Sequence, residues 1–143
     1  MANFKAQDVP MMPPALLRKL QGLTQSFNHA AATATDSTAQ ALGTVSKPGI
    51  ISELAISLTA LPAADETLAF SLLVNAVEVA AFTATALNVQ AGVYYVLDNV
   101  FTGSRDVNVG DILTLTRDYT AGGGPTPIGY NNFHVEVSDM DSL

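Results

Sequence analysis

From residue 48 to its end, the chain is a series of short segments in which apolar and polar residues alternate. A period of two is the pattern of a β-strand with one buried face. About seven such segments follow one another at spacings of roughly 8–15 residues, which is typical of antiparallel sandwiches and barrels. No interval is long enough for the crossover helix of a parallel sheet. The sequence therefore predicts a mainly β protein built as an antiparallel, jelly-roll-like β-sandwich.

The longest of these segments lies within residues 106–124, where a Gly110-Asp111 turn leads into a strand. Asn75-Ala76 has the position of a two-residue hairpin loop between two further strands. Residues 92–100 are apolar on both faces, which predicts a central strand or one covered by a neighbouring subunit. The residues predicted to face the core are Leu54, Ile56, Leu58, Leu68, Phe70, Leu72, Leu113, Leu115, Phe133, Val135 and Val137.

Residues 1–47 have a different character, and we predict that they form a segment separate from a body at residues 48–143. The chain begins with an extended arm, and a short α-helix is predicted after Pro13-Pro14. A linker of small polar residues follows at 31–47. The helix either lies on its own domain or packs against a partner. The residues expected to make contacts here are Met11 and Met12 of the arm and Leu16, Leu20, Leu23 and Phe27 of the helix.

Charged residues are scarce: they make up 13% of the chain, against 48% hydrophobic residues and about 25% charged residues in ordinary domains. Such a neutral surface suits a subunit of an assembly better than a free monomer. Residues 51–143 carry eleven acidic and two basic side chains, so the body should repel nucleic acid. No apolar stretch approaches the roughly 20 residues of a membrane-spanning helix. We expect neither nucleic-acid binding nor membrane insertion.

The chain has no cysteine, which excludes disulfides and thiolate chemistry, and its first residues lack the pattern of a secretory signal. We therefore expect synthesis in a reducing compartment.

Candidate catalytic and metal-binding groups are few. Residues 106–111 are rich in oxygen ligands but do not match a calcium-binding loop, so a β-turn is predicted. Asp65-Glu66 is predicted to be a solvated turn. His29 is placed on the last turn of the predicted helix and His134 on a polar strand face, each without a second ligand at metal-binding spacing. There is no G-x-S-x-G motif. We expect no enzyme activity, no cofactor and no metal site.

Two features could instead bind a partner protein or a sugar. The loop of Gly122, Gly123, Gly124 and Pro125 is either an interaction loop or a plain connection. Four aromatic residues could form a platform for sugars or pack in the core, namely Tyr94, Tyr95, Phe101 and Tyr119. Sugar platforms most often use tryptophan, which the chain lacks, so core packing is favoured.

Several stretches of the body resemble the small β-sandwich structural proteins of tailed-bacteriophage particles, above all head decoration (cement) proteins. They are ADETLAF at 64–70, LVNAV at 73–77, VNVGDILTLTR at 107–117 and YTAGGGP at 119–125. The resemblance covers roughly residues 50–138. It implies a component of the virion, synthesised in the host cytoplasm and placed on the capsid surface, often as a homotrimer.

In such a family the N-terminal arm commonly contacts the shell, and no active-site residues are involved. The partners implied are the major capsid protein and sister subunits, which the protein would bridge to stabilise the capsid. Two alternatives remain open: a receptor- or glycan-binding module of a fibre or tail, and a neck or collar component.

Overall fold

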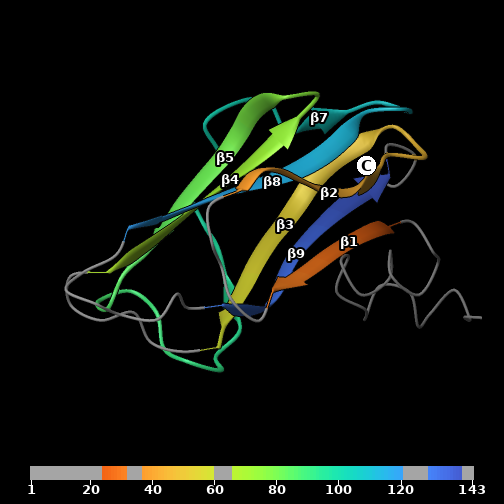
Figure 1. Cartoon of the computed structure of the whole chain (residues 1–143). Helices are drawn as coiled ribbons and strands as arrows, with labels where there is room; N and C mark the ends of the chain where they lie inside the picture. The colour runs from red at the N-terminus through yellow and green to blue at the C-terminus, as the bar shows by residue number, and fades with distance from the viewer. Residues whose placement is uncertain (1–23, 32–36, 60–65, 121–128, 140–143) are drawn as a thin grey trace, which may run out of the picture.

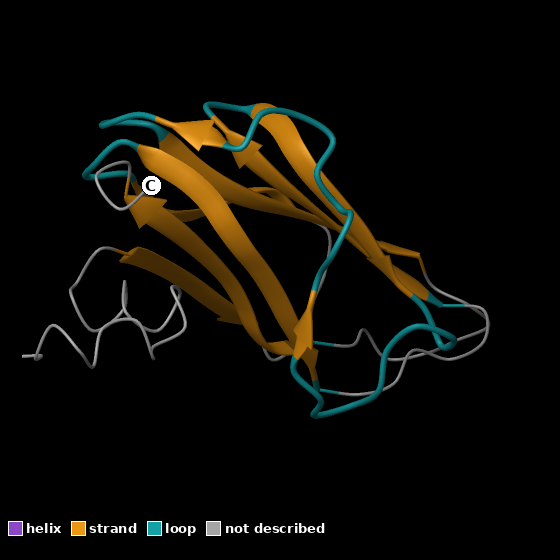
Figure 2. Ribbon diagram, turned by 180° about the vertical axis from the view of Figure 1, so that it is seen from behind, coloured by secondary structure: helices purple, strands orange, loops and turns teal. Residues whose placement is uncertain are grey.

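The computed structural model describes residues 24–31, 37–59, 66–120 and 129–139, and all its regular elements there are strands (Figures 1 and 2). Within this part of the chain no helix could cross a membrane. The strands are β1 (Thr24–Ala31), β2 (Ser37–Thr44), β3 (Gly49–Leu58), β4 (Thr67–Val74), β5 (Val77–Ala84), β6 (Tyr95–Val96), β7 (Asp106–Val107), β8 (Ile112–Thr120) and β9 (Tyr130–Asp139).

The strands form two sheets whose pairs are all antiparallel. Sheet A has the order β1-β9-β3-β6, and β7 also pairs with β3. Sheet B has the order β2-β8-β4-β5. The two sheets lie face to face around one hydrophobic core, an arrangement compatible with the predicted β-sandwich (Figure 1).

The eleven residues predicted to face the core are all buried. They lie on strands β3, β4, β8 and β9. At the centre of the core, Phe70 of sheet B packs between two aromatic residues of sheet A. Its ring centroid lies 5.4 Å from that of Tyr130, edge to face, and 5.6 Å from that of Phe133, stacked. These rings join the two sheets by the large apolar area that aromatic side chains bury.

The turns also follow from local sequence. Asn75 and Ala76 adopt left-handed backbone angles, with φ of 50° and 67°, as a two-residue hairpin between β4 and β5 requires. The predicted β-turn before β8 is present as well. There the Asp111 carboxylate accepts hydrogen bonds from the Asn108 backbone N–H and the Asn75 amide, at 2.8 Å each. These bonds lower the pKa of Asp111, and they hold the two turns together at one end of the body.

The predicted helix is wrong over residues 24–30, because this segment is strand β1 and pairs with β9. Residues 37–44 of the predicted linker likewise form strand β2, which pairs with β8. This part of the expected separate segment therefore belongs to the two sheets. Residues 1–23 lie outside the described residues, and so do Met11, Met12, Leu16, Leu20 and Leu23 of the predicted contact set.

The predicted long strand at 92–100 is also corrected. Only Tyr95 and Val96 form a strand, β6, at the edge of sheet A. Left-handed angles at Gly92 and Asn99 interrupt the extended backbone on either side. Val93, Tyr94 and Val96 are exposed, whereas Leu97 is buried in the core. Because β6 pairs only with β3 among the described strands, the segment is an edge and not a central strand.

Phe27 was predicted to contact a partner, but its ring packs against the core of its own chain. The ring from β1 lies over Gly43 of β2 and so joins the first strands of the two sheets. A Cβ added at Gly43 would lie only 2.6 Å from the Phe27 ring. Glycine at this position is thus required by the close approach of an aromatic ring.

We expect Gly43→Ala to destabilise the protein by about 1–3 kcal/mol, the usual effect of overpacking. Urea unfolding would measure the change in the free energy of unfolding. The double variant Gly43→Ala, Phe27→Leu tests the cause, because a smaller side chain at residue 27 relieves the clash. Strictly additive effects of the two substitutions would contradict this explanation.

Candidate functional site: a histidine and two glutamates on the outer face of sheet A

Strands β3 and β9 bring three ionisable side chains together on the face of sheet A that points away from the core. Along β9, Val135 and Val137 face inward, so His134 and Glu136 face outward. Glu136 is paired in register with Glu53 of β3. The strand register shifts between Ile51 and Glu53, and this irregularity places Glu53 outside although Ile51 faces the core.

The potential ligand atoms of Glu53, His134 and Glu136 all lie within 4.8 Å of one another, and we call these residues the His–Glu–Glu cluster. Nε2 of His134 is 3.3 Å from Oε2 of Glu136. Glu136 is only 5% exposed despite its outward direction. The cluster is therefore set into the surface rather than extended into solvent.

Two neighbouring side chains position the His–Glu–Glu cluster. Nδ1 of His134 lies 2.8 Å from the side-chain oxygen of Asn28, which faces it from β1. The Tyr94 hydroxyl donates a hydrogen bond of 3.2 Å to Glu53. Burial raises the pKa of Tyr94, and the adjacent Glu53 carboxylate raises it further. The phenol thus stays protonated and remains a donor to Glu53.

One imidazole and two carboxylates can form an ion pair or hold a divalent cation. Sequence reasoning predicted no metal site because it compared ligand spacing along the chain. His134 and Glu136 are two residues apart on one strand face, which is a detectable but common pattern. Glu53 comes from a strand far away in the sequence, so only the pairing of β3 with β9 places it there.

The other histidine, His29, belongs to β1 and not to a helix end as predicted. It takes part in a polar chain that joins the sheets. Arg117 of β8 donates to the Tyr130 hydroxyl through Nη1 at 3.1 Å, and that oxygen lies 2.6 Å from Nδ1 of His29. When His29 is neutral with its proton on Nε2, the Tyr130 hydroxyl donates its proton to Nδ1 of His29. This arrangement requires neutral His29.

We expect His29 to make stability depend on pH. Burial, and secondarily the charge of Arg117, lowers the pKa of His29 from its ordinary value of 6.5. The unfolded chain then binds this proton more readily than the folded one, so stability falls as the pH drops from 6.5 toward the lowered pKa. Urea unfolding of the wild type and His29→Gln at several pH values measures the difference. A difference that stays constant across this range would contradict the prediction.

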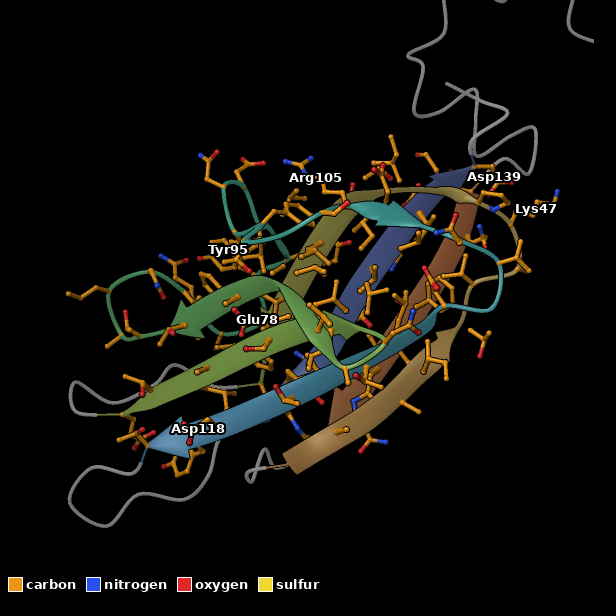
Figure 3. The ribbon with its side chains drawn as sticks, turned by 90° about the horizontal axis from the view of Figure 1, so that it is seen from above. Lys47, Glu78, Tyr95, Arg105, Asp118 and Asp139 are labelled. Atoms are coloured by element: carbon orange, nitrogen blue, oxygen red, sulfur yellow. The ribbon has the colours of Figure 1, made fainter. Side chains whose placement is uncertain are left out.

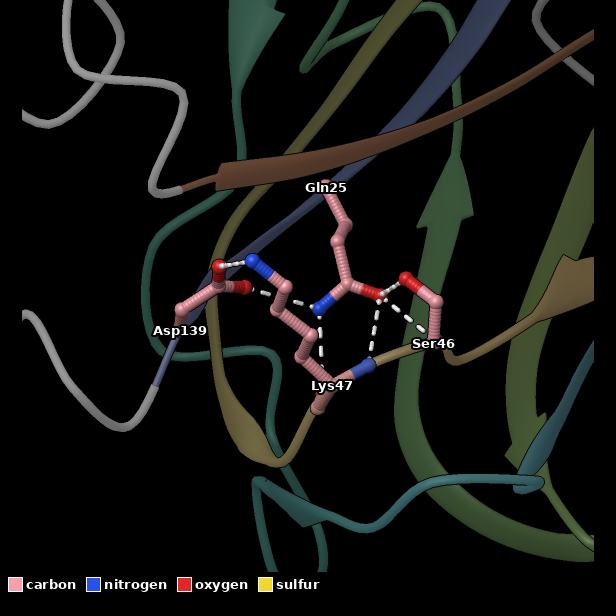
Figure 4. Close-up of polar contacts among 4 residues, drawn as sticks. All are labelled: Gln25, Ser46, Lys47 and Asp139. Atoms are coloured by element: carbon pink, nitrogen blue, oxygen red, sulfur yellow. Dashed lines mark hydrogen bonds and ion pairs between the residues drawn. The ribbon is translucent and has the colours of Figure 1, made fainter.

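A second polar group fastens β1 to the end of the body that carries the turns (Figure 4). The side-chain oxygen of Gln25 accepts bonds from the Ser46 N–H at 2.8 Å and the Ser46 hydroxyl at 2.9 Å. Its amide donates to Asp139 at 2.9 Å and to the Lys47 carbonyl at 3.0 Å. Lys47 and Asp139 also form an ion pair of 3.8 Å, and both lie at one end of the body (Figure 3). These contacts hold β1 against the segment after β2 and the end of β9, so we infer a structural role for them.

The structure also bears on the predicted contact loop, the four aromatic residues and the acidic pair before β4. The loop of Gly122, Gly123, Gly124 and Pro125 lies outside the described residues. Tyr95, Phe101 and Tyr119 pack partly against the core, in line with core packing, whereas Tyr94 is 51% exposed. Asp65 and Glu66 were predicted to be solvated in a turn; Asp65 lies outside the described residues, and Glu66 is only 4% exposed.

Exposed apolar side chains gather at both ends of the body. Val77, Val109 and Ile112 surround the two turns joined by Asn75 and Asp111, and we call them the turn-end patch. Leu87 follows the end of β5 and Val93 lies next to the opposite end of β3, and we call these two residues the loop-end patch. The exposed Val96 lies instead on the edge strand β6, where it pairs with Ala55 of β3. Leu87 is 98% exposed and Val77 66%.

The described residues thus present the His–Glu–Glu cluster and two apolar patches, on a chain that carries few charges. Fold alone does not imply a function. No family model, curated protein or solved structure matches the chain.

Proposed function

We propose that the protein is a structural component of a tailed-bacteriophage virion, namely a head decoration protein. In this proposal a jelly-roll-like body docks on the capsid surface and stabilises it by bridging neighbouring capsomers. The observation that carries the proposal is the pair of exposed apolar patches at the two ends of the body. The sequence resemblance to phage decoration proteins supports the same function.

The positions of the patches suit a bridging role. Strand β4 has eight residues, so the two ends of the body are about 26 Å apart at 3.3 Å per residue. A subunit with an apolar contact at each end can touch two neighbours at once. Several weak contacts then hold collectively, because each bound end raises the effective concentration of the other.

The partners in this proposal are the major capsid protein and sister subunits, with a homotrimer as the favoured assembly. The low content of charged residues agrees with a surface that is covered in an assembly. Residues 1–23 and the loop at 122–125 stay in the proposal as further contact segments. Phe27 is removed from it, because its partly buried ring packs against the core of its own chain.

One observation favours a second function, binding of glycans by a fibre or tail module. Tyr94 is 51% exposed and lies beside the carboxylate of Glu53. An aromatic ring next to a hydrogen-bond acceptor is an arrangement that can recognise a sugar. A glycan array with the full chain separates the two functions, since a decoration protein should bind no glycan on it.

Charge substitutions in the patches test the decoration proposal. We expect Leu87→Asp and Val109→Asp each to weaken attachment to undecorated capsids about tenfold or more, because burying such a side chain contributes about 1.5–3 kcal/mol. Co-sedimentation with capsids would measure the affinity. Thr83→Asp, at an exposed position on β5, is the matched control for the added charge. Unchanged attachment of both patch variants would overturn the proposal.

A further inference from the structure

We propose that Glu53, His134 and Glu136 form a binding site for one divalent first-row transition-metal cation of the Zn²⁺ type. The site lies on the outer face of sheet A and is independent of the proposed role in a virion. It rests on the positions of three side chains that β3 and β9 bring together.

The distances suit such an ion. Zn²⁺ is bound by histidine nitrogen and carboxylate oxygen at about 2.0–2.2 Å, so neighbouring ligand atoms in a tetrahedral site lie about 3.3–3.5 Å apart. The Nε2 of His134 and Oε2 of Glu136 are already 3.3 Å apart. All three ligand atoms lie within 4.8 Å of one another. A small rotation of the half-buried Glu53 side chain would bring its carboxylate to the same spacing.

The surroundings of His134 resemble those of metal-bound histidines, which usually donate their other ring N–H to an oxygen acceptor. The side-chain oxygen of Asn28 occupies this position, 2.8 Å from Nδ1. With the proton on Nδ1, Nε2 carries the free electron pair on the side of the two carboxylates. Tyr94 holds Glu53 in a similar way by donating to one of its oxygens.

The ligand types favour a transition metal over Mg²⁺ or Ca²⁺. Magnesium and calcium prefer sites made of oxygen alone, whereas imidazole suits zinc and its neighbours in the first transition row. Three ligands from the protein leave one tetrahedral position for water or for a group of a bound molecule. The two glutamates are paired directly across strands, where like charges repel, so a cation between them would stabilise the sheet.

A different explanation of the same distances is an ion pair between protonated His134 and Glu136. In that case the cluster holds a proton in place of a metal, and Zn²⁺ would not bind to it. The two explanations therefore predict opposite results for metal binding.

The test uses the full chain without a histidine tag, titrated with Zn²⁺ at neutral pH by calorimetry, with the thermal unfolding midpoint measured in parallel. We expect one Zn²⁺ per chain and a higher unfolding midpoint with Zn²⁺. His134→Gln and Glu53→Gln should each weaken binding at least about tenfold, and Asn28→Ala by about 10–100-fold. His29→Gln is the matched control, because the chain has only two histidines, and it should bind Zn²⁺ as the wild type does.

Circular dichroism of each variant before titration would confirm that it is folded. Nuclear magnetic resonance of the two imidazoles gives a readout independent of affinity, because Zn²⁺ should shift the ring signals of His134 and leave those of His29 in place. Absence of saturable binding to the wild type would overturn the proposal. Equal binding by the wild type, His134→Gln and Glu53→Gln would overturn it as well.

Discussion

Deletion of residues 1–35 should prevent the protein from folding, whereas deletion of residues 1–22 should leave a folded body. The longer deletion removes β1, which pairs with β9 along its length. It also removes Phe27 from the core, the Gln25 hydrogen bonds and the bond of His29 to Tyr130. The sequence alone favoured the opposite result, because residues 1–47 were expected to be separate from the body.

The size of the effect follows from the interactions lost. Full burial of a phenylalanine contributes about 1.5–3 kcal/mol, and the partly buried Phe27 contributes a share of this. Each hydrogen bond adds a net of about 0.5–1.5 kcal/mol. Domains of this size have a total stability of about 5–15 kcal/mol, so loss of a whole strand removes a large share of it.

Circular dichroism and thermal unfolding of the two truncated proteins measure the difference. The shorter deletion is the control, since it retains every described strand. A 1–35 deletion variant that unfolds cooperatively at the wild-type temperature would show that β1 is dispensable, and the described role of this strand would then be wrong.

The second large effect is expected for Phe70→Ala, which should lower the free energy of unfolding by about 3–5 kcal/mol. Phe70 is 2% exposed and packs between Tyr130 and Phe133 of the opposite sheet. Its removal leaves a cavity between the sheets and takes away both ring contacts.

Phe82→Ala is the matched control for this substitution. Phe82 is the partner of Phe70 across the β4–β5 pair, but it is only partly buried. Urea unfolding should show a clearly smaller loss for Phe82→Ala. Equal losses for the two variants would mean that Phe70 does not join the sheets in the way described.

Strands β3, β4, β5, β8 and β9 could be predicted from the sequence because their apolar residues alternate and their turns carry Asn75, Gly110 or similar residues. Strand β1 was missed for a physical reason. Phe27 is the only large apolar side chain within β1, so the sequence of this segment shows no alternation that would separate a strand from a helix. Only the pairing with β9 decides between the two.

Strand β2 was missed because its register against β8 shifts twice, between Ser37 and Gln40 and between Ala41 and Gly43. Such irregularities disrupt the alternation on which a prediction depends. The His–Glu–Glu cluster was missed because Glu53 and His134 become neighbours only through strand pairing. Local alternation thus predicts strands such as β3, β8 and β9, whereas sites made by distant strands require the fold.

The central proposal, a decoration protein of a phage head, is tested most directly by whether purified virions contain the protein and at what copy number. A decoration protein covers the capsid lattice, so quantitative mass spectrometry should find it in numbers comparable with those of the major capsid protein. Electron microscopy of the same particles should show it on the outer surface of the head. A few copies per particle at the neck or tail, or absence from the particles, would contradict the account.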